Sequence, residues 1–180
     1  MTYTTKTFQI NDFPPEDVKA VKAKCGLRRA DRFTAMAVYA VSKAFSEQFP
    51  HFLQEDAAII TASSFGPINT TLALLDDILD YPEDKILPTK FSHSVHNAIT
   101  SYACAILGIH GPAFALTNNE NQHETAIATA KSLLDSKTAP HVLIIEIHEK
   151  SVIAELLPQA MPEKHAEIEP ESVTITLIEP

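Results

Sequence analysis

The sequence predicts an α/β fold in which helices cover a mostly parallel mixed sheet. Two short apolar runs, 57–61 and 141–147, have the composition of strands that are buried on both faces. Helical periodicity is clearest between Phe33 and Phe45, where apolar residues recur every three or four positions. Strands that are separated by helices are joined by right-handed crossovers, which pair them in parallel. The alternation therefore predicts one sheet with helices packed on its faces.

Local signals predict the other elements. We expect, in chain order, an edge strand at 1–10, a short helix that begins at 14–17, a turn at 63–67 followed by a helix, a helix at 94–108, a strand at 113–117, a helix at 121–136, and closing antiparallel strands at 151–157 and 173–178. The helix at 94–108 is apolar on most sides, so it needs cover on most sides. The helix at 121–136 is amphipathic and presents one face to water or to a polar partner.

Composition limits the possible functions. A chain of 180 residues suits a single domain, 1–180, with a loop at 158–172 before the last strand. The net charge of −9 argues against a nucleic-acid or anionic-membrane surface. No apolar run reaches the length of a membrane span, and the N-terminus has no signal-peptide pattern. Two cysteines, Cys25 and Cys104, are no disulfide framework, so we expect a cytoplasmic protein.

Three segments, in this order, resemble β-ketoacyl synthases of the thiolase superfamily. Residues 28–33 (Arg-Arg-Ala-Asp-Arg-Phe) resemble the Arg-x-x-Asp-Arg-Phe segment that opens a long helix in the family. Residues 88–97 and then 108–112 resemble the family's Pro-to-Asn helix and its Gly-x-x-Gly-Pro turn, and 171–179 resembles the strand that ends the synthase N-terminal half. The resemblance spans nearly the whole chain and implies a thiolase-like half domain from fatty acid or polyketide-type biosynthesis.

Two departures from the family concern its chemistry. The family's nucleophilic cysteine follows the strand after Gly-Pro, and counting from Pro112 places Glu120 at that position. The two imidazoles that activate the family's cysteine come from the second half of a synthase, which this chain does not contain. Acyl transfer to an enzyme needs a thiolate or an equally activated nucleophile, and a carboxylate is a poor acyl acceptor. We therefore expect no condensation by this chain alone.

The resemblance leaves three interpretations of Glu120. Chain-length-factor subunits resemble synthases, carry glutamine instead of the cysteine and pair with an active synthase, so the nearly isosteric Glu120 fits a non-catalytic partner. Alternatively, Glu120 helps to hold a malonyl-like thioester. In the third interpretation, Asn118, Asn119 and Glu120 simply cap a helix. The other residues that we expect to contact a substrate or partner are His96, Asn97, Asn118, Asn119 and Asn121.

The resemblance also implies partners. Family members dimerise through the strand after Gly-Pro, so we expect an obligate homo- or heterodimer. The interface residues would be Ala113, Phe114, Ala115, Leu116 and Thr117. A ketosynthase or an acyl carrier protein is the expected partner. We expect no cofactor and no metal ion, because the histidines lack a convergent set of Cys, Asp or Glu and are more typical of surface or hydrogen-bonded groups.

Three functions stay open at this point. The first is a non-condensing subunit that partners a synthase or a carrier protein. The second is an enzyme that acts on acyl or malonyl thioesters with Glu120 at the active position. The third is a thiolase-fold binding domain with no remaining pathway role, because a fold does not fix a function. The amphipathic helix at 121–136 favours a half domain that exists on its own.

Overall fold

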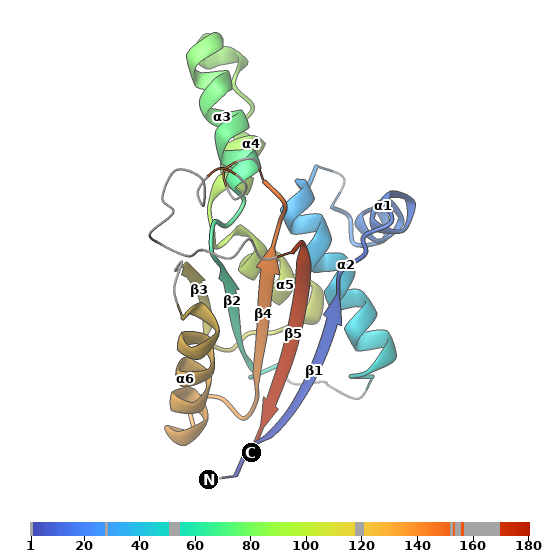
Figure 1. Cartoon of the computed structure of the whole chain (residues 1–180), viewed down its shortest axis with the longest axis vertical. Coiled ribbons are helices and arrows are strands. Elements are labelled where there is room, and N and C mark those ends of the chain that lie inside the picture. Colours follow the sequence, from blue (N-terminus) through green and yellow to red (C-terminus); the bar gives the residue numbers. More distant parts are fainter. Residues whose placement is uncertain are drawn as a thin grey trace.

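A computed structural model describes residues 2–27, 29–50, 55–117, 121–151, 153, 156 and 170–180. These residues form a five-stranded mixed sheet with the strand order β1-β5-β4-β2-β3 (Figure 1). The strands are β1 (Thr4–Ile10), β2 (Ala58–Ser63), β3 (Ala113–Thr117), β4 (Val142–His148) and β5 (Ser172–Glu179). β2 pairs in parallel with β3 and β4, whereas β5 pairs antiparallel with β4 and β1. The predicted mixed α/β sheet and its N-terminal edge strand are confirmed.

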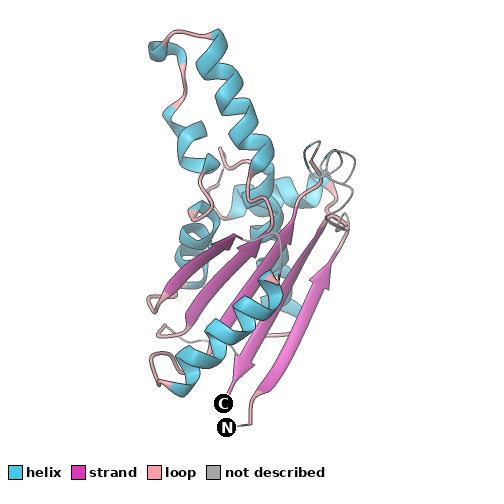
Figure 2. Ribbon diagram, turned by 60° about the vertical axis from the view of Figure 1, so that its left-hand side comes forward, coloured by secondary structure: helices cyan, strands magenta, loops and turns pink. Residues whose placement is uncertain are grey.

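Helices cover the two central strands, β2 and β4, on both faces. α2 (Arg32–Glu47) and α5 (Ala98–Leu107) lie on one face of the sheet, and α6 (Gln122–Asp135) lies across the other (Figure 2). Side chains of β4 alternate between the two cores, so that Leu143 packs with α2 and α5 while Val142 packs with α6. This double cover explains why both strands are apolar runs in the sequence.

The start of α2 connects several elements. Asp31 is the N-cap residue, and its carboxylate accepts a hydrogen bond from the backbone N–H of Thr34 at 3.0 Å. The second carboxylate oxygen of Asp31 accepts a hydrogen bond from the Thr70 hydroxyl at 2.7 Å, which joins α2 to the first turn of α3 (Ile68–Asp80). The apolar stripe of α2 is buried from Phe33 to Val41. One capping residue therefore fixes both the helix and its neighbour.

A helical hairpin projects beyond the end of the sheet (Figures 1 and 2). We call residues 68–94 the arm; it consists of α3, the short 3₁₀ helix η1 (Glu83–Lys85) and α4 (Pro88–Ser94). The sequence correctly predicts α3, but the apolar stripe of this helix is largely exposed, and Leu79 is 82% accessible. The large exposed apolar side chains of the arm are Leu75, Ile78, Leu79, Tyr81, Leu87 and Phe91. An apolar surface of this kind marks an interaction site.

Two predicted elements differ from the structure. The helix expected at 94–108 is divided, because Val95 has extended backbone after α4 and α5 begins only at Ala98. The strand expected at 151–157 is wrong at Ile153 and Leu156, whose backbone is helical. Alternation over so few residues does not distinguish a strand from a helix, since these two positions also fit helical spacing. The rest of that segment after Ser151, and most of the predicted loop at 158–172, lie outside the described residues.

In the described part of the chain, no helix combines the length and the apolar character that crossing a bilayer requires. Cys104 is half-buried and packs against the cluster formed by α2 and α5, and burial raises the pKa of its thiol.

Candidate functional site at the start of helix α6

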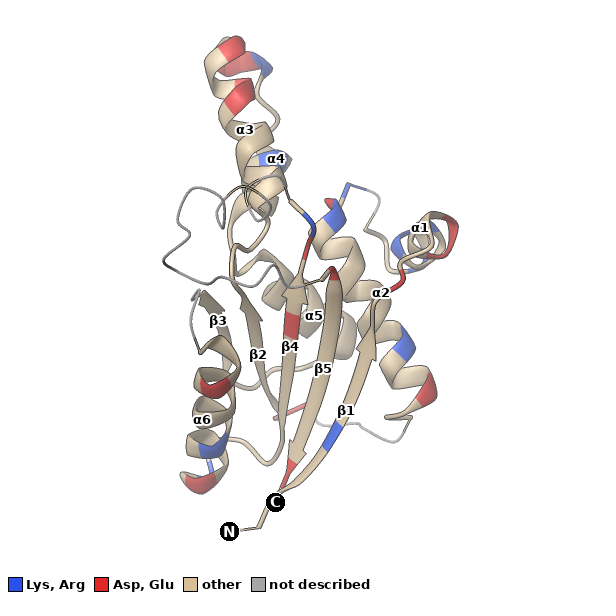
Figure 3. Cartoon of the chain, viewed as in Figure 1, with Lys and Arg blue, Asp and Glu red and all other residues tan. Residues whose placement is uncertain are grey.

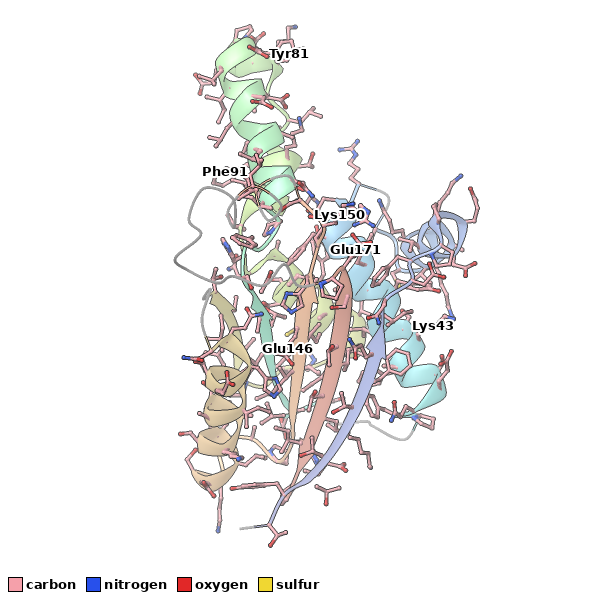
Figure 4. All side chains as sticks on the ribbon, viewed as in Figure 1. Lys43, Tyr81, Phe91, Glu146, Lys150 and Glu171 are labelled. Carbon is pink, nitrogen blue, oxygen red and sulfur yellow. The ribbon has the colours of Figure 1, made fainter. Side chains whose placement is uncertain are left out.

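A group of polar side chains lies where β4 ends and α6 begins. Val142 and Ile144 point from β4 toward α6 and belong to the core on that side. Because side chains alternate along a strand, Glu146 and His148 continue the same face. The face of β4 therefore changes from apolar to polar beside the first turn of α6, and Glu146 lies near the middle of the sheet (Figure 4).

Glu146 holds His123 by its Nδ1 atom. The Glu146 carboxylate is buried, and both of its oxygens lie 3.0 Å from Nδ1 of His123 in the first turn of α6. The side chain of His123 is 58% exposed. A buried carboxylate at Nδ1 favours the tautomer in which Nδ1 carries the hydrogen, which leaves the lone pair on Nε2. The pair is thus an oriented imidazole with an available basic nitrogen.

Gln122 and His148 adjoin this pair. The Gln122 Nε2 atom lies 3.4 Å from the His148 Nε2 atom, and Gln122 is buried. Among the residues that the structure describes, the Oε1 atom of Gln122 has no hydrogen-bond partner. A buried acceptor without a donor is unfavourable by about 1–3 kcal/mol. A donor that is supplied by a bound molecule or a partner chain would therefore be stabilised at this position.

No side chain of the described residues caps the start of α6. Asn121 occupies the N-cap position with φ 58° and ψ 29°, and its side chain makes no capping hydrogen bond. Asparagine tolerates this left-handed backbone better than most residues. The first backbone N–H groups of a helix have no partner within the helix, and the helix dipole favours negative charge there. The start of α6 therefore suits a carboxylate or a developing oxyanion.

The residues that the sequence singles out are only partly described. Asn118, Asn119 and Glu120 lie outside the described residues, whereas the N-cap position belongs to Asn121. Asn97 precedes α5, and its carbonyl accepts hydrogen bonds from Ser101.

His96 lies against Gly66 and lines a cavity of about 10 Å³ together with Ser63 and Thr117. Such a cavity has room for about one water molecule. Because β2, β3 and β4 are parallel, their carboxyl ends lie at the same end of the sheet. His96 and the His123–Glu146 pair also lie at this end.

Sequence reasoning missed Glu146 and His148. A signal was present, because Glu146 is the only charged residue between Val142 and Ile147 in an otherwise apolar strand. A buried carboxylate in such a strand requires a partner. The expectation that the histidines are hydrogen-bonded is confirmed for His123. Among the residues that the structure describes, no three His, Cys, Asp or Glu side chains are arranged to hold a metal ion.

A second polar cluster joins two of the segments on which the resemblance depends. The Arg32 guanidinium donates hydrogen bonds to both oxygens of Glu171, at 2.7 and 2.6 Å. The Glu171 carboxylate also accepts a bond from the backbone N–H of Lys150, and Glu171 and Lys150 lie together at one end of the sheet (Figure 4). Arg32 holds the pKa of Glu171 below its usual value. The cluster fastens the start of α2 to the start of β5.

Glu149 lies in the same cluster. Its side chain is 2% exposed, and the Arg32 guanidinium is 3.6 Å from one of its oxygens. Burial raises the pKa of Glu149 to about 7, because the effect of burial exceeds that of the Arg32 charge. The other oxygen, Oε2, has no hydrogen-bond partner within the described part of the chain.

Comparison with known proteins supports the resemblance. The profile of the family described as "Beta-ketoacyl synthase, N-terminal domain" matches residues 4–172. A search of the curated proteins finds no match. The ishigamide ketosynthase/chain length factor superposes with a TM-score of 0.75 at 15% identity, over 93% of this chain and 48% of that protein. The chain therefore spans about half the length of that protein.

Two other solved structures are similar in fold. The ketosynthase ApeO in complex with its chain length factor ApeC, from Xenorhabdus doucetiae, gives a TM-score of 0.70 at 16% identity, over 99% of this chain and 79% of that one. A β-ketoacyl synthase from Burkholderia phymatum gives 0.64 at 11% identity, over 93% of this chain and 44% of that one. The predicted thiolase-like half-domain fold is confirmed. By its fold and by the profile match over nearly its whole length, the chain belongs to the β-ketoacyl synthase N-terminal domain family.

Proposed function

We propose that the chain is a non-condensing β-ketoacyl synthase-like subunit of fatty acid or polyketide-type acyl-chain biosynthesis, and that it acts by pairing with a ketosynthase. The observation that carries the proposal is the amount of apolar surface that the chain leaves open at one sheet edge and on the arm. A stable folded subunit seldom exposes large apolar patches unless another molecule covers them.

The first open surface is β3. In the described sheet β3 is an edge strand that pairs only with β2, and Phe114 is 39% exposed. Its residues, Ala113 to Thr117, include no charged residue and no proline, which are the usual means of blocking an exposed edge. The outer N–H and C=O groups of β3 can therefore pair with a strand of a second subunit, and residues 113–117 form the proposed interface.

The second open surface is the apolar side of the arm. Tyr81 lies at the outer end of the arm and Phe91 lies nearer its base (Figure 4). Acidic residues gather at the outer end, among them Asp80, Glu83 and Asp84 (Figure 3). Apolar anchors beside charged groups are typical of a subunit interface with a polar rim. The arm supports pairing with a larger partner that covers it.

The comparisons support a ketosynthase as the class of partner. Two of the similar structures contain a ketosynthase with a chain length factor. A third similar structure, AntDE:AntF, contains a type II polyketide acyl-carrier protein in complex with its ketosynthase bound to the hexaketide. It superposes with a TM-score of 0.67 at 15% identity over 83% of this chain. These relatives support a heterodimer with a ketosynthase as the first choice and an acyl carrier protein as a further contact.

The pairing is tested with affinity-tagged protein in lysate of the native cell, read by mass spectrometry, together with native mass measurement of the purified chain. We expect recovery of a cysteine-bearing ketosynthase, and loss of that ketosynthase with Phe114→Glu or Leu79→Glu. Lys131→Glu, on the exposed face of α6, is the matched control and should retain it. A chain that is monomeric at micromolar concentration and recovers no ketosynthase would overturn the proposal.

The His123–Glu146 pair favours a second candidate function, that of an enzyme acting on acyl or malonyl thioesters with Glu120 at the active position. The His123 Nε2 atom would take a proton from water as the resulting hydroxide attacks the thioester carbonyl, and the imidazolium would return the proton to the departing thiolate. The first-turn amides of α6 would stabilise the oxyanion. Release of free thiol from acyl or malonyl thioesters, abolished by His123→Gln or by Glu120→Ala, would support this function. Unchanged release in both variants would exclude it.

A further inference from the structure

A groove of about 570 Å³ lies between α1 (Pro15–Lys24) and α2, outside the site and the surfaces described above. Its volume falls within the range of about 300–1,000 Å³ that is typical of small-molecule sites. The apolar part of its wall consists of Phe13, Pro15, Val18, Ala23, Ala35 and Met36. Three cations, Lys19, Lys22 and Arg32, also line the groove. The groove thus combines an apolar wall with positive charge.

The positive charge that is available to a ligand is that of Lys22. Its ammonium donates one hydrogen bond, 2.5 Å long, to the carbonyl oxygen of Ala30 just before α2 begins. Arg32 is already paired with Glu171, and Lys19 lies 4.0 Å from Glu16. Within the described ranges, no carboxylate lies within ion-pair distance of Lys22. An ammonium has three donors, so Lys22 keeps two for an anion.

The groove follows α1, which lines it from Pro15 to Ala23. Lys22 is seven residues beyond Pro15, which corresponds to about 10 Å along the helix axis. Phe13, which precedes α1, also lines the groove and packs edge-on against Tyr39 of α2, with ring centroids 6.1 Å apart. The groove therefore runs from an ammonium group near the end of α1 to an aromatic side chain at its start, about two turns away. This layout matches a molecule with an anionic head and a straight hydrocarbon tail.

We propose that the groove between α1 and α2 binds a medium-chain fatty carboxylate, with the carboxylate on Lys22 and the hydrocarbon tail between Val18 and Met36. A charge-assisted hydrogen bond holds the head, and removal of the tail from water supplies the remaining affinity. The binding of this small molecule does not depend on the pairing proposed above.

The test is displacement of the fluorescent probe dansyl-undecanoic acid from the purified full-length chain by decanoate. We expect saturable displacement, weakened at least about tenfold by Lys22→Ala, since a hydrogen bond to a charged group contributes at least about 1.5 kcal/mol. Decanol has the same tail without the charge, so its weaker displacement should be the same in native protein and in Lys22→Ala. Lys24→Ala is the matched control, because Lys24 is on the same helix but does not line the groove.

Val18→Trp fills the groove from the half-buried face of α1 and should abolish probe binding while leaving the circular dichroism melting curve unchanged. Sedimentation with phosphatidylglycerol vesicles tests whether the groove binds a lipid headgroup instead of a free carboxylate. We expect that the chain does not sediment with these vesicles. The proposal is overturned if decanoate does not displace the probe, or if Lys22→Ala and Lys24→Ala weaken the displacement by decanoate equally. It is also overturned if the Val18→Trp variant still binds the probe. Sedimentation of the chain with vesicles, together with no displacement of the probe by decanoate, would overturn it as well.

Discussion

Glu149 is a carboxylate whose ionisation makes the folded protein less stable. Its folded-state pKa is about 7, raised from the ordinary value of 4.5 by burial. Between these two pH values the folded protein keeps a proton that the unfolded chain has already lost. Stability is therefore highest below pH 4.5 and falls as the pH rises through the folded-state pKa, after which this contribution is constant.

The size of the effect follows from the pKa difference. A rise from 4.5 to about 7 corresponds to about 3 kcal/mol at 1.36 kcal/mol per pH unit. Glutamine at this position has nearly the same shape and carries no charge at any pH. We therefore expect Glu149→Gln to be about 3 kcal/mol more stable than the native protein at pH 8, and the difference to shrink below about 1 kcal/mol near pH 4.5.

The measurement is urea unfolding of both proteins at several pH values between 4.5 and 8.5, monitored by circular dichroism. Titrating groups that do not interact with Glu149 contribute equally to the two proteins, so the difference reports on Glu149 and its cluster. Glu171→Gln is the opposing control: its pKa is lowered by Arg32, so the native carboxylate stabilises the protein above pH 4.5 and the substitution should destabilise it at pH 7. A Glu149→Gln variant that is less stable at pH 8, or a difference that does not change with pH, would refute this reasoning.

Three further predictions concern local geometry. Gly66 has φ +59°, and a Cβ atom there would lie 2.6 Å from His96 Nε2. Gly66→Ala should therefore lower the free energy of unfolding by at least about 1–2 kcal/mol. In thermal melts, adding His96→Ala should recover part of this loss. Nitrogen NMR should find His123 with its hydrogen on Nδ1, and Glu146→Leu should shift the tautomer toward Nε2; an unchanged spectrum would contradict the pairing. Asp31→Ala should destabilise the protein by about 1 kcal/mol, whereas Asn121→Gly should cause no loss, because only Asp31 makes a capping bond; equal losses in urea unfolding would argue against this contrast.

Periodicity predicted the secondary structure well where each element has a strong pattern of its own. The stripe from Phe33 to Val41 gave α2, and the apolar runs gave β2 and β4, because burial on a sheet demands those patterns. Local pattern does not reveal what lies opposite an apolar residue. The apolar stripe of α3, including Leu79, predicts a helix but not its surroundings, and in the structure most of it is exposed on the arm.

The candidate site depended on contacts between distant residues, which periodicity does not report. Glu146 and His123 are 23 positions apart and meet only because α6 crosses the face of β4. The count from Pro112 to Glu120 gave a position in the sequence but no contacts, and that residue lies outside the described ranges. The resemblance supplied the family, whereas the structure supplied the oriented imidazole.

The strand order has a consequence for how the chain folds. β5, the last strand, lies between β1 and β4, so the first strand of the protein has the last strand as its neighbour in the sheet. Arg32 and Glu171, which join the start of α2 to the start of β5, are 139 positions apart. Closing such a long loop precedes any gain from these contacts, which slows folding. During synthesis, β1 must remain without its pairing partner until β5 has left the ribosome, so the sheet cannot be completed before that point.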